Sequence, residues 1–234
     1  MTSKVAIIPA RGGSKRIPHK NIKEFCGLPM IAYSIDTVQR SDLFDRIIVS
    51  TDDEEIARVA RKYGAEVPFI RPKELADDFA TTAEVMGHAL DWLEQYDQEY
   101  DYVCTVYATA PLLRSVYLQQ GFEKLEKSDA INAFSAAIMP FPVQRAFKIT
   151  ANGRCEMLWP EHFTSRSQDL EETYQDAGQF YWRKLKQTST EIMFSKHSIP
   201  VIIPSHLVQD IDTHEDWERA ELMYKILQKQ SMER

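Results

Sequence analysis

The sequence predicts an α/β fold with a doubly wound, mostly parallel sheet. The prediction rests on the alternation of segments along the chain and on its length. Short apolar runs rich in β-branched residues alternate with segments of helical periodicity through the first 136 residues. Such alternation is typical of βαβ units, in which helices cover both faces of a parallel sheet. The length of 234 residues fits a single domain with room for a large core.

Each predicted strand is a short apolar run of the kind that is buried on both faces of a sheet. We expect strands at residues 5–8, 45–51, 66–71, 102–107, 130–136 and 200–204. The predicted helices have one apolar face and lie at residues 29–40, 53–63, 81–96, 115–127 and 213–230. Gly64 is placed to end the second helix, and capping signals at residues 81–84 and 213–216 begin the third and the last.

The regular alternation stops between residues 138 and 198. This segment contains prolines, aromatic residues and short mixed stretches, which we interpret as hairpins inserted into the sheet domain. We therefore expect a single domain over residues 1–234, with residues 138–198 as a small inserted region.

Composition and charge exclude several classes of function. The formal charge is −7, from 28 basic and 35 acidic side chains, which argues against general binding to nucleic acid or an anionic membrane. No apolar run approaches the roughly 20 residues that span a bilayer, and the first apolar stretch is too short for a secretory signal. The three cysteines are far apart and suit neither a disulfide framework nor a zinc site. We expect a cytoplasmic protein.

The loop after the first strand holds the strongest functional signal. Residues 10–21 read ARGGSKRIPHKN. Five cations fall within 13 positions with no acid among them: Arg11, Lys15, Arg16, Lys20 and Lys23. Ligands of open α/β sheets bind at the carboxyl ends of strands, and adjacent glycines let backbone N–H groups approach an anion. The loop therefore predicts a triphosphate site rather than a solvated basic surface. It contains neither GxxxxGK[ST] nor GxGxxG, which excludes a Walker A loop and a dinucleotide-binding loop.

Asp210-Ile211-Asp212, after the last predicted strand, is the second signal. Alternation along an extended chain puts both carboxylates on one side, about 7 Å apart at the backbone. Mg²⁺ commonly takes one or two carboxylates together with substrate phosphate oxygens. We therefore expect Asp210 and Asp212 to hold Mg²⁺ beside the triphosphate loop. The alternative is a turn in which one of the two aspartates caps the following helix.

Three motifs together resemble the cytidylyltransferases that activate nine-carbon 2-keto sugar acids, a family that includes the CMP-sialic acid synthetases. They are IIPARGGSKRIPHKN at residues 7–21, RPKELADD at residues 71–78 and DIDTHED at residues 210–216. The resemblance covers nearly the whole chain and implies a nucleotide-diphospho-sugar transferase-like, Rossmann-type fold. It also implies that the anomeric hydroxyl of a sugar acid attacks the α-phosphate of CTP, so that pyrophosphate leaves and a CMP-sugar forms.

The resemblance also assigns residues by position. Those that match the family's CTP-binding loop and nucleotide contacts are Arg11, Gly12, Gly13, Ser14, Lys15, Lys20, Asn21, Arg71, Asp78 and Thr81. Asp210 and Asp212 match the magnesium ligands. Arg11, Lys15 and Lys20 are the expected catalytic cations, which stabilise phosphate charge. Asp212, directly or through its metal, is expected to assist deprotonation of the sugar hydroxyl. The resemblance further implies a homodimer that pairs through the inserted region.

Differences from the sialic acid synthetases narrow the choice of the sugar substrate. Their usual QPTSPLR becomes YATAPLLR at residues 107–114, and RPNGAIY becomes QDAGQFY at residues 175–181. Polar groups are lost and aromatic surface is gained, which suits a deoxy, N-acylated sugar. The combination resembles bacterial pseudaminic acid cytidylyltransferases, which serve surface or flagellin glycosylation. The expected sugar contacts are Tyr107, Arg166, Gln179 and Tyr181, with Arg166 on the sugar carboxylate. Packing in the core or at a dimer interface is the alternative for the aromatic residues.

Other functions stay open at the level of sequence. Sialic, legionaminic or 3-deoxy-octulosonic acid would use the same fold and metal chemistry, so only the sugar pocket discriminates among them. A glycosyltransferase is a rival, because DxD motifs hold the metal of nucleotide-sugars, although the Gly-rich basic loop suits an intact triphosphate better. A non-catalytic nucleotide-binding module would bind CTP without turnover.

Overall fold

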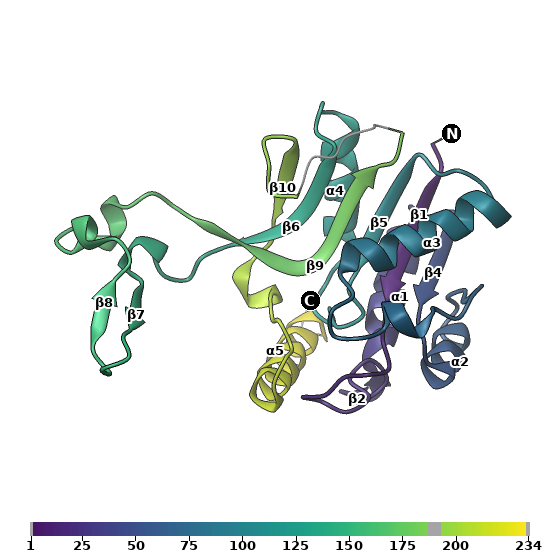
Figure 1. The fold of residues 1–234 in the computed structure, drawn as a ribbon, viewed down its shortest axis with the longest axis horizontal. Coiled ribbons are helices and arrows are strands. Elements are labelled where there is room, and N and C mark those ends of the chain that lie inside the picture. The colour runs from purple at the N-terminus through teal and green to yellow at the C-terminus, as the bar shows by residue number, and fades with distance from the viewer. Residues whose placement is uncertain (1, 187–192, 233–234) are drawn as a thin grey trace.

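The computed structural model describes residues 2–186 and 193–232. The strands of its central sheet are β1 (Lys4–Pro9), β4 (Arg46–Ser50), β5 (Tyr102–Val106), β6 (Asn132–Ile138), β9 (Tyr174–Lys184) and β10 (Ser198–Ile202). They lie in the order β10-β6-β9-β5-β1-β4 (Figure 1). Neighbouring strands are parallel except at β9, which runs antiparallel to both β5 and β6. The predicted mostly parallel sheet is therefore confirmed.

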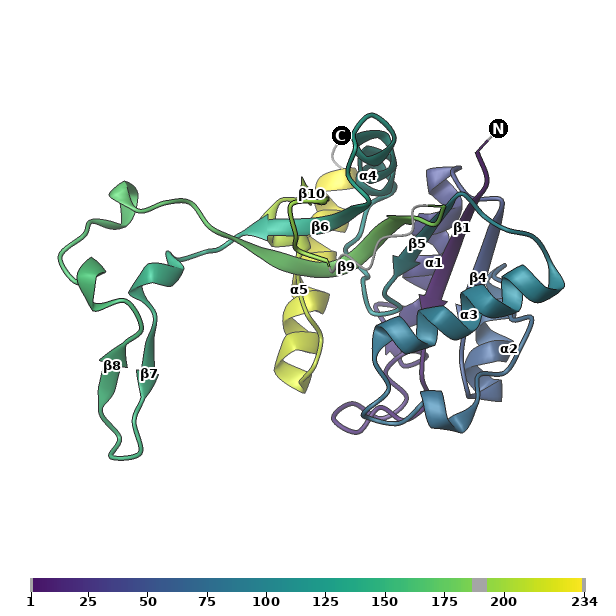
Figure 2. The same cartoon turned by 45° about the horizontal axis from the view of Figure 1, so that its top comes forward.

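Helices cover both faces of this sheet. They are α1 (Met30–Ser41), α2 (Glu54–Lys62), α3 (Thr82–Tyr96), α4 (Ser115–Glu126) and α5 (His214–Met232). Residues of α1, α2 and α4 share an apolar cluster with Ala6 and Ile8 of β1, whereas α3 packs with Val5 and Ile7 on the opposite face (Figure 2). Successive side chains of a strand point to opposite faces, so the apolar run of β1 serves both layers. This is the doubly wound fold that the sequence predicts.

The last helix packs on the small hairpin that follows the basic loop. That hairpin consists of β2 (Glu24–Phe25) and β3 (Leu28–Pro29). Phe25 makes edge-on contacts with Tyr33 of α1 and Trp217 of α5, at ring-centroid distances of 5.4 and 5.5 Å. The segment before α5 is thereby held beside the loop after β1, although about 190 residues separate them in the chain.

The predicted strand at residues 66–71 is wrong. A single parallel bridge, between Glu66 and Ile48, joins this fully described stretch to the sheet. Pro68 follows two residues later, and proline has no N–H to donate to a ladder of hydrogen bonds. The other predicted strands and helices are present, with ends shifted by a few residues.

The described residues of the region 138–198, predicted as one insertion of hairpins, divide into two parts; residues 187–192 of that prediction lie outside the described residues. The strand β9 returns to the middle of the sheet, where Phe180 and Trp182 are fully buried. An ideal Cβ on Gly121 of α4 would lie 2.9 Å from ring atoms of both residues, so this helix approaches β9 closely. Phe180 and Trp182 therefore belong to the core and not to a sugar pocket.

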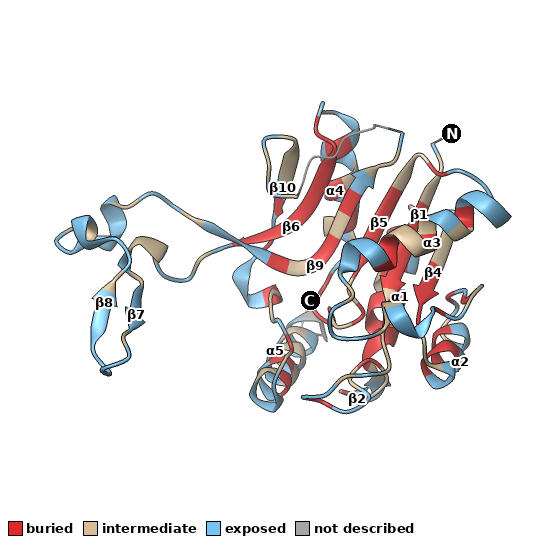
Figure 3. Ribbon diagram, viewed as in Figure 1, coloured by how far each residue is buried: buried red, intermediate tan, exposed pale blue. Residues whose placement is uncertain are grey.

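Residues 139–173 form the other part, which we call the arm. The arm projects from the sheet and contains the hairpin of β7 (Phe147–Ile149) and β8 (Cys155–Met157) (Figure 1). Its remaining regular structure is three 3-10 turns at Val143–Arg145, Pro160–His162 and Ser167–Asp169. All of the arm is described, and none of its residues is buried (Figure 3).

Two further 3-10 turns, Lys73–Leu75 and Ser205–Leu207, lie in the connections before α3 and α5. Within the described part of the chain, none of the helices has both the length and the apolar character needed to span a membrane.

Candidate active site

A cleft of about 350 Å³ lies at the carboxyl ends of β1 and β5. Pro9 at the end of β1 and the residues just after β5 form its floor, as expected for a ligand site in an open α/β sheet. The predicted site residues that line it are Arg11, Ser14, Lys15, Lys20, Asn21, Arg71, Asp78, Tyr107 and Asp212. The structure thus brings together residues that are far apart in the sequence.

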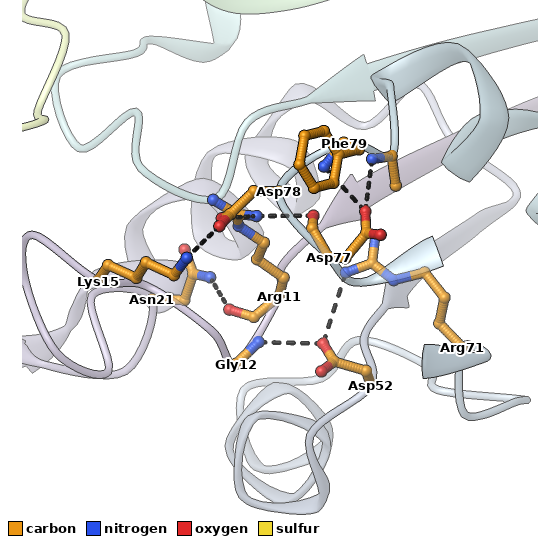
Figure 4. A network of polar contacts seen from close by, with 10 residues as sticks. Arg11, Gly12, Lys15, Asn21, Asp52, Arg71, Asp77, Asp78 and Phe79 are labelled. Carbon is orange, nitrogen blue, oxygen red and sulfur yellow. Dashed lines mark hydrogen bonds and ion pairs between the residues drawn. The ribbon is translucent and has the colours of Figure 1, made fainter. Parts of the chain in front are cut away.

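Hydrogen bonds between side chains and backbone groups hold the basic loop in place. The Gly12 N–H donates to Asp52 Oδ1 at 3.0 Å, and the buried Asn21 amide donates to the Arg11 carbonyl at 2.9 Å (Figure 4). A Cβ on Gly12 would lie 2.7 Å from a carboxylate oxygen of Asp53, so a larger residue here would displace the Asp53 side chain. The loop is therefore anchored at both its beginning and its end.

Two of the loop's cations are paired with Asp78. Arg11 Nη1 lies 3.0 Å from Asp78 Oδ1 and also donates to the Asp77 carbonyl at 2.8 Å, while Lys15 Nζ pairs with the other Asp78 oxygen (Figure 4). These hydrogen bonds, that of Lys15 above all, hold the pKa of the Asp78 carboxyl below its ordinary value. Asp78 thus occupies two cations that a triphosphate would use. Its negative charge would also repel a phosphate group bound nearby.

Two other cations are paired with Asp212. Arg16 Nη2 lies 2.9 Å from Asp212 Oδ2, and Lys20 Nζ lies 3.4 Å from Asp212 Oδ1. Lys20 also donates to the Ile211 carbonyl at 2.6 Å. The fifth cation, Lys23, lies over the Trp217 ring at 4.7 Å from its centroid and does not line the cleft.

The alternative in which Asp210 or Asp212 caps the last helix is wrong. That role belongs to Thr213, whose hydroxyl accepts from the Asp216 N–H at 3.2 Å, while the Asp216 carboxylate accepts from the Thr213 N–H at 2.9 Å and the Thr213 hydroxyl at 2.7 Å. These hydrogen bonds hold the pKa of Asp216 below its ordinary value. The two carboxylates of Asp210 and Asp212 are therefore not used at the start of α5.

The donor set at residues 210–212 fits a magnesium ion. Desolvation, followed by repulsion from Asp212, raises the pKa of Asp210, and no described side chain pairs with its carboxylate. A cation shared by the two aspartates would relieve that repulsion. The described residues contain no group of three or more His, Cys, Asp or Glu that could hold a metal. Two carboxylates without a third protein ligand suit Mg²⁺, which completes its shell with phosphate oxygens and water.

Arg71 and Asp52 form a second anchor under the cleft. The Arg71 side chain is only 3% exposed, and its Nη2 lies 3.6 Å from Asp52 Oδ1. Its Nε and Nη2 atoms have no hydrogen-bond acceptor among the described residues. Burial lowers the pKa of Arg71, and the charge of Asp52 opposes that shift. The sequence reasoning missed Asp52, although its place directly after the second strand, at the same edge as the basic loop, was an available signal.

Several predicted residues do not line the cleft. The Thr81 hydroxyl begins α3, accepting from the Glu84 N–H at 3.2 Å and donating to the Glu84 carboxylate at 2.8 Å. Gly12 and Gly13 contribute loop backbone, and Asp210 lies just outside. Thr81 is therefore a helix cap in this structure.

The predicted sugar residues on β9 lie behind Tyr107. The Tyr107 and Tyr181 rings are 5.4 Å apart, and the Tyr181 hydroxyl donates to Asp176 at 2.6 Å. Burial raises the pKa of Tyr181 above its ordinary value. The Gln179 side chain is buried, and its amide donates to the Leu207 carbonyl at 2.6 Å. Of this set, Tyr107 alone lines the cleft.

Arg166 lies on the arm and outside the cleft of its own chain. Its guanidinium pairs with Asp169 through two hydrogen bonds of 2.6 and 3.0 Å. Both side chains are exposed. The arm projects from the sheet (Figure 1), and Arg166 does not line the cleft, so the predicted clamp is not formed within one chain.

Known proteins resemble this chain in sequence and in fold. The family model for cytidylyltransferases matches residues 5–210. A pseudaminic acid cytidylyltransferase of Campylobacter jejuni subsp. jejuni serotype O:23/36 is 47% identical over 223 residues, which cover 95% of this chain and 96% of that protein. A CMP-N,N'-diacetyllegionaminic acid synthase of Legionella pneumophila subsp. pneumophila is 31% identical over 235 residues, covering 96% of this chain and 97% of that protein.

A solved structure of CMP:2-keto-3-deoxy-manno-octonic acid synthetase complexed with CTP has the same fold. It matches with a TM-score of 0.69 and 14% identity, covering 96% of this chain and 99% of that one. The expected nucleotidyltransferase fold is thereby confirmed. With the family model and the two relatives, the motifs of the basic loop, the Arg71 segment and the aspartate pair lead to one conclusion: this chain belongs to the cytidylyltransferase family.

Proposed function

We propose that this protein couples CTP to a nonulosonic acid, pseudaminic acid in particular, and releases pyrophosphate and the CMP-sugar. The observation that carries the chemistry is the set of four loop cations at the cleft, paired with two carboxylates that phosphates would replace. The relative that is 47% identical over 95% of the chain supports the choice of sugar. The CMP-sugar would serve surface or flagellin glycosylation.

The reaction needs positioned charge more than covalent chemistry. An anomeric hydroxyl oxygen forms a bond to the α-phosphorus of CTP, and the bond between that phosphorus and the oxygen bridging to the β-phosphorus breaks. Arg11, Lys15, Arg16 and Lys20, which all line the cleft, would supply donors for the phosphate oxygens. Asp212, which lines the cleft, would assist removal of the hydroxyl proton, either directly or through the metal that it would hold.

Asp210 and Asp212 would hold Mg²⁺ together with phosphate oxygens of the substrate. When bound, the ion supplies neutralisation of phosphate charge and acidification of an attacking hydroxyl. Asp212 would then exchange contacts with Arg16 and Lys20 for the metal, which frees both cations for the triphosphate.

The arm would pair with a second copy of this chain. Three of its large apolar side chains, those of Phe147, Ile149 and Phe163, are 60%, 75% and 72% exposed, and apolar surface of this kind favours an interface. Because the described arm carries Arg166 away from its own cleft, Arg166 would clamp the sugar carboxylate in the cleft of the partner. The proposed active unit is therefore a homodimer.

Pyrophosphate release from CTP with a panel of nonulosonic acids tests the function. We expect Mg²⁺-dependent release with pseudaminic acid and at least about tenfold lower kcat/KM with the others. Turnover only with sialic or legionaminic acid would overturn the sugar assignment. Transfer from a nucleotide-sugar without pyrophosphate release from CTP would overturn the reaction itself.

A further inference from the structure

We propose that Asp52 is a positioning residue that couples the triphosphate loop to Arg71 and thereby sets the affinity for the nucleotide. This inference rests on the proposed function, because it assigns the cleft to a nucleoside triphosphate. Asp52 does not line the cleft, so it acts through the two groups that it holds.

One carboxylate oxygen makes both contacts. Asp52 Oδ1 accepts the Gly12 N–H at 3.0 Å and lies 3.6 Å from Arg71 Nη2 (Figure 4). The Asp52 side chain is 20% exposed and that of Arg71 is 3% exposed. Among the described residues, no other acid pairs with Arg71. The negative charge of Asp52 is thus the counter-charge of a buried guanidinium.

The backbone around Asp52 is fixed on both sides. The Ala10 N–H donates to the Ser50 carbonyl at 2.9 Å, which extends the pairing of β1 and β4 to the start of the basic loop. The Arg71 N–H donates to the Thr51 carbonyl at 2.8 Å. Three chain segments, residues 10–12, 50–53 and 71, therefore meet at the Asp52 side chain. The carboxylate joins two segments that both face the cleft.

The physical role follows from burial. A buried guanidinium without its counter-charge turns toward water or toward another acid, because an unpaired charge is costly in a low-dielectric site. Arg71 has two nitrogen atoms with no acceptor among the described residues, Nε and Nη2. A nucleotide in the cleft meets the part of the Arg71 side chain that lines it, and that part stays in place only while Asp52 holds the guanidinium. The same oxygen fixes the direction of the Gly12 N–H in the loop.

Equilibrium titration of CTP in the presence of Mg²⁺ tests the coupling without any sugar acid. D52N keeps an oxygen that can accept from Gly12 but loses the charge beside Arg71, and we expect the Kd to rise about tenfold. D52A loses both contacts, and we expect a rise of about a hundredfold. D53N is the matched control, because the neighbouring Asp53 begins α2 and an asparagine keeps that cap. Its Kd should stay within about twofold of the unmodified protein.

A double-mutant cycle with R71L shows whether Asp52 acts through Arg71. If it does, D52N changes the Kd by less than about twofold in the R71L background. An additive tenfold loss in that background would overturn the coupling. The double variant also contains no unpaired buried guanidinium, so it remains measurable if D52N alone fails to fold. Steady-state assays should show a raised KM for CTP and a kcat within about threefold of the unmodified enzyme.

Failure of this inference and failure of the proposed function have different signatures. An unchanged Kd in D52N, in a protein that turns over CTP and a sugar acid, would overturn the role of Asp52 alone. CTP binding that depends on Asp52 without any pyrophosphate release would sustain the coupling and overturn the reaction. Absence of CTP binding in the unmodified protein would overturn both.

Discussion

The cleft and the arm differ in how their side chains are held. At the cleft, loops leave neighbouring parallel strands, and the loop after β1 is tied to other segments by Asp52 and Asp212. In the arm, no residue is buried and the hairpin is held by its own pairing (Figure 3). Contacts within one chain thus hold the side chains of the cleft, whereas the exposed arm has few such contacts.

The Arg71–Asp52 pair shows the same contrast with the arm. Arg71 in the cleft is buried beside one carboxylate, while the Arg166–Asp169 and Lys148–Glu156 pairs of the arm are exposed. Exposed ion pairs contribute little because water screens them, and buried ones fix geometry because an unpaired partner is costly. Substitutions in the two regions should therefore act by different routes.

The largest expected effect is at the aspartate pair. D210A and D212A should each lower Mg²⁺-dependent pyrophosphate release by about a thousandfold or more, because each removes a proposed metal ligand. The unfolding temperature should change little, since both side chains are outside the core. E215A is the control, because Glu215 is an exposed acid in the first turn of the adjacent helix α5. Full activity in both aspartate variants would refute the metal assignment.

The next effect tests whether the arm serves a second copy. R166A should lower kcat/KM for the sugar acid by about ten- to a hundredfold through loss of a carboxylate clamp. Mixed dimers of R166A with D212A should regain activity, because one cleft then has both Asp212 and a partner's Arg166. R154A, at an exposed position of the same arm, should behave like the unmodified protein. If activity does not recover in the mixture, Arg166 does not act in the cleft of a second copy.

A smaller effect is expected at Asp78. D78N should lower the Kd for CTP by about three- to tenfold, because phosphates no longer compete with a carboxylate for Arg11 and Lys15. E74Q, in the same connection but outside the cleft, should leave the Kd unchanged. Weaker binding in D78N would instead mean that Asp78 contacts the nucleotide itself, as the sequence resemblance implies.

The smallest expected effect is on the pH dependence of stability, which should differ between an ion pair beside the sheet and one on the arm. Asp101, just before β5, hydrogen-bonds Lys186 and the Ser3 N–H, which lowers its pKa to about 2. A carboxyl with a depressed folded-state pKa adds stability above its unfolded pKa, and this is lost as the pH falls from about 4 to 2. D101N should lower the free energy of unfolding by about 1 kcal/mol at pH 7, after allowance for screening.

The same substitution should flatten the pH dependence of stability in that acidic range. E156Q breaks the exposed ion pair between Glu156 and Lys148 of the arm. It should change neither the free energy of unfolding at pH 7 nor its dependence on pH. Denaturant unfolding from pH 7 to pH 2 measures both variants. An equal loss in E156Q would show that the arm is as firmly held as the sheet.

Much of the sheet was predictable from the chain alone. Strands and helices alternate with clear periodicity, and parallel strands place their following loops at one edge. The apolar pattern of residues 66–71 predicts a strand, but Pro68 cannot donate to a ladder of hydrogen bonds, and only one bridge forms in this fully described stretch. The strand β9 was missed because its residues mix polar and apolar types, and its partners lie about 40 to 80 residues away in the chain.

The sequence by itself determined the fold class, the basic loop, the position of the aspartate pair and the family, because these depend on local pattern and on motif order. The tertiary structure alone decided which carboxylates pair with the cations, that Asp52 holds Arg71, and that Phe180 and Trp182 are core. It also decided that Arg166 lies on the arm and does not line the cleft of the same chain. These features arise from contacts between segments far apart in the chain, and no local periodicity encodes which distant charges or rings will meet.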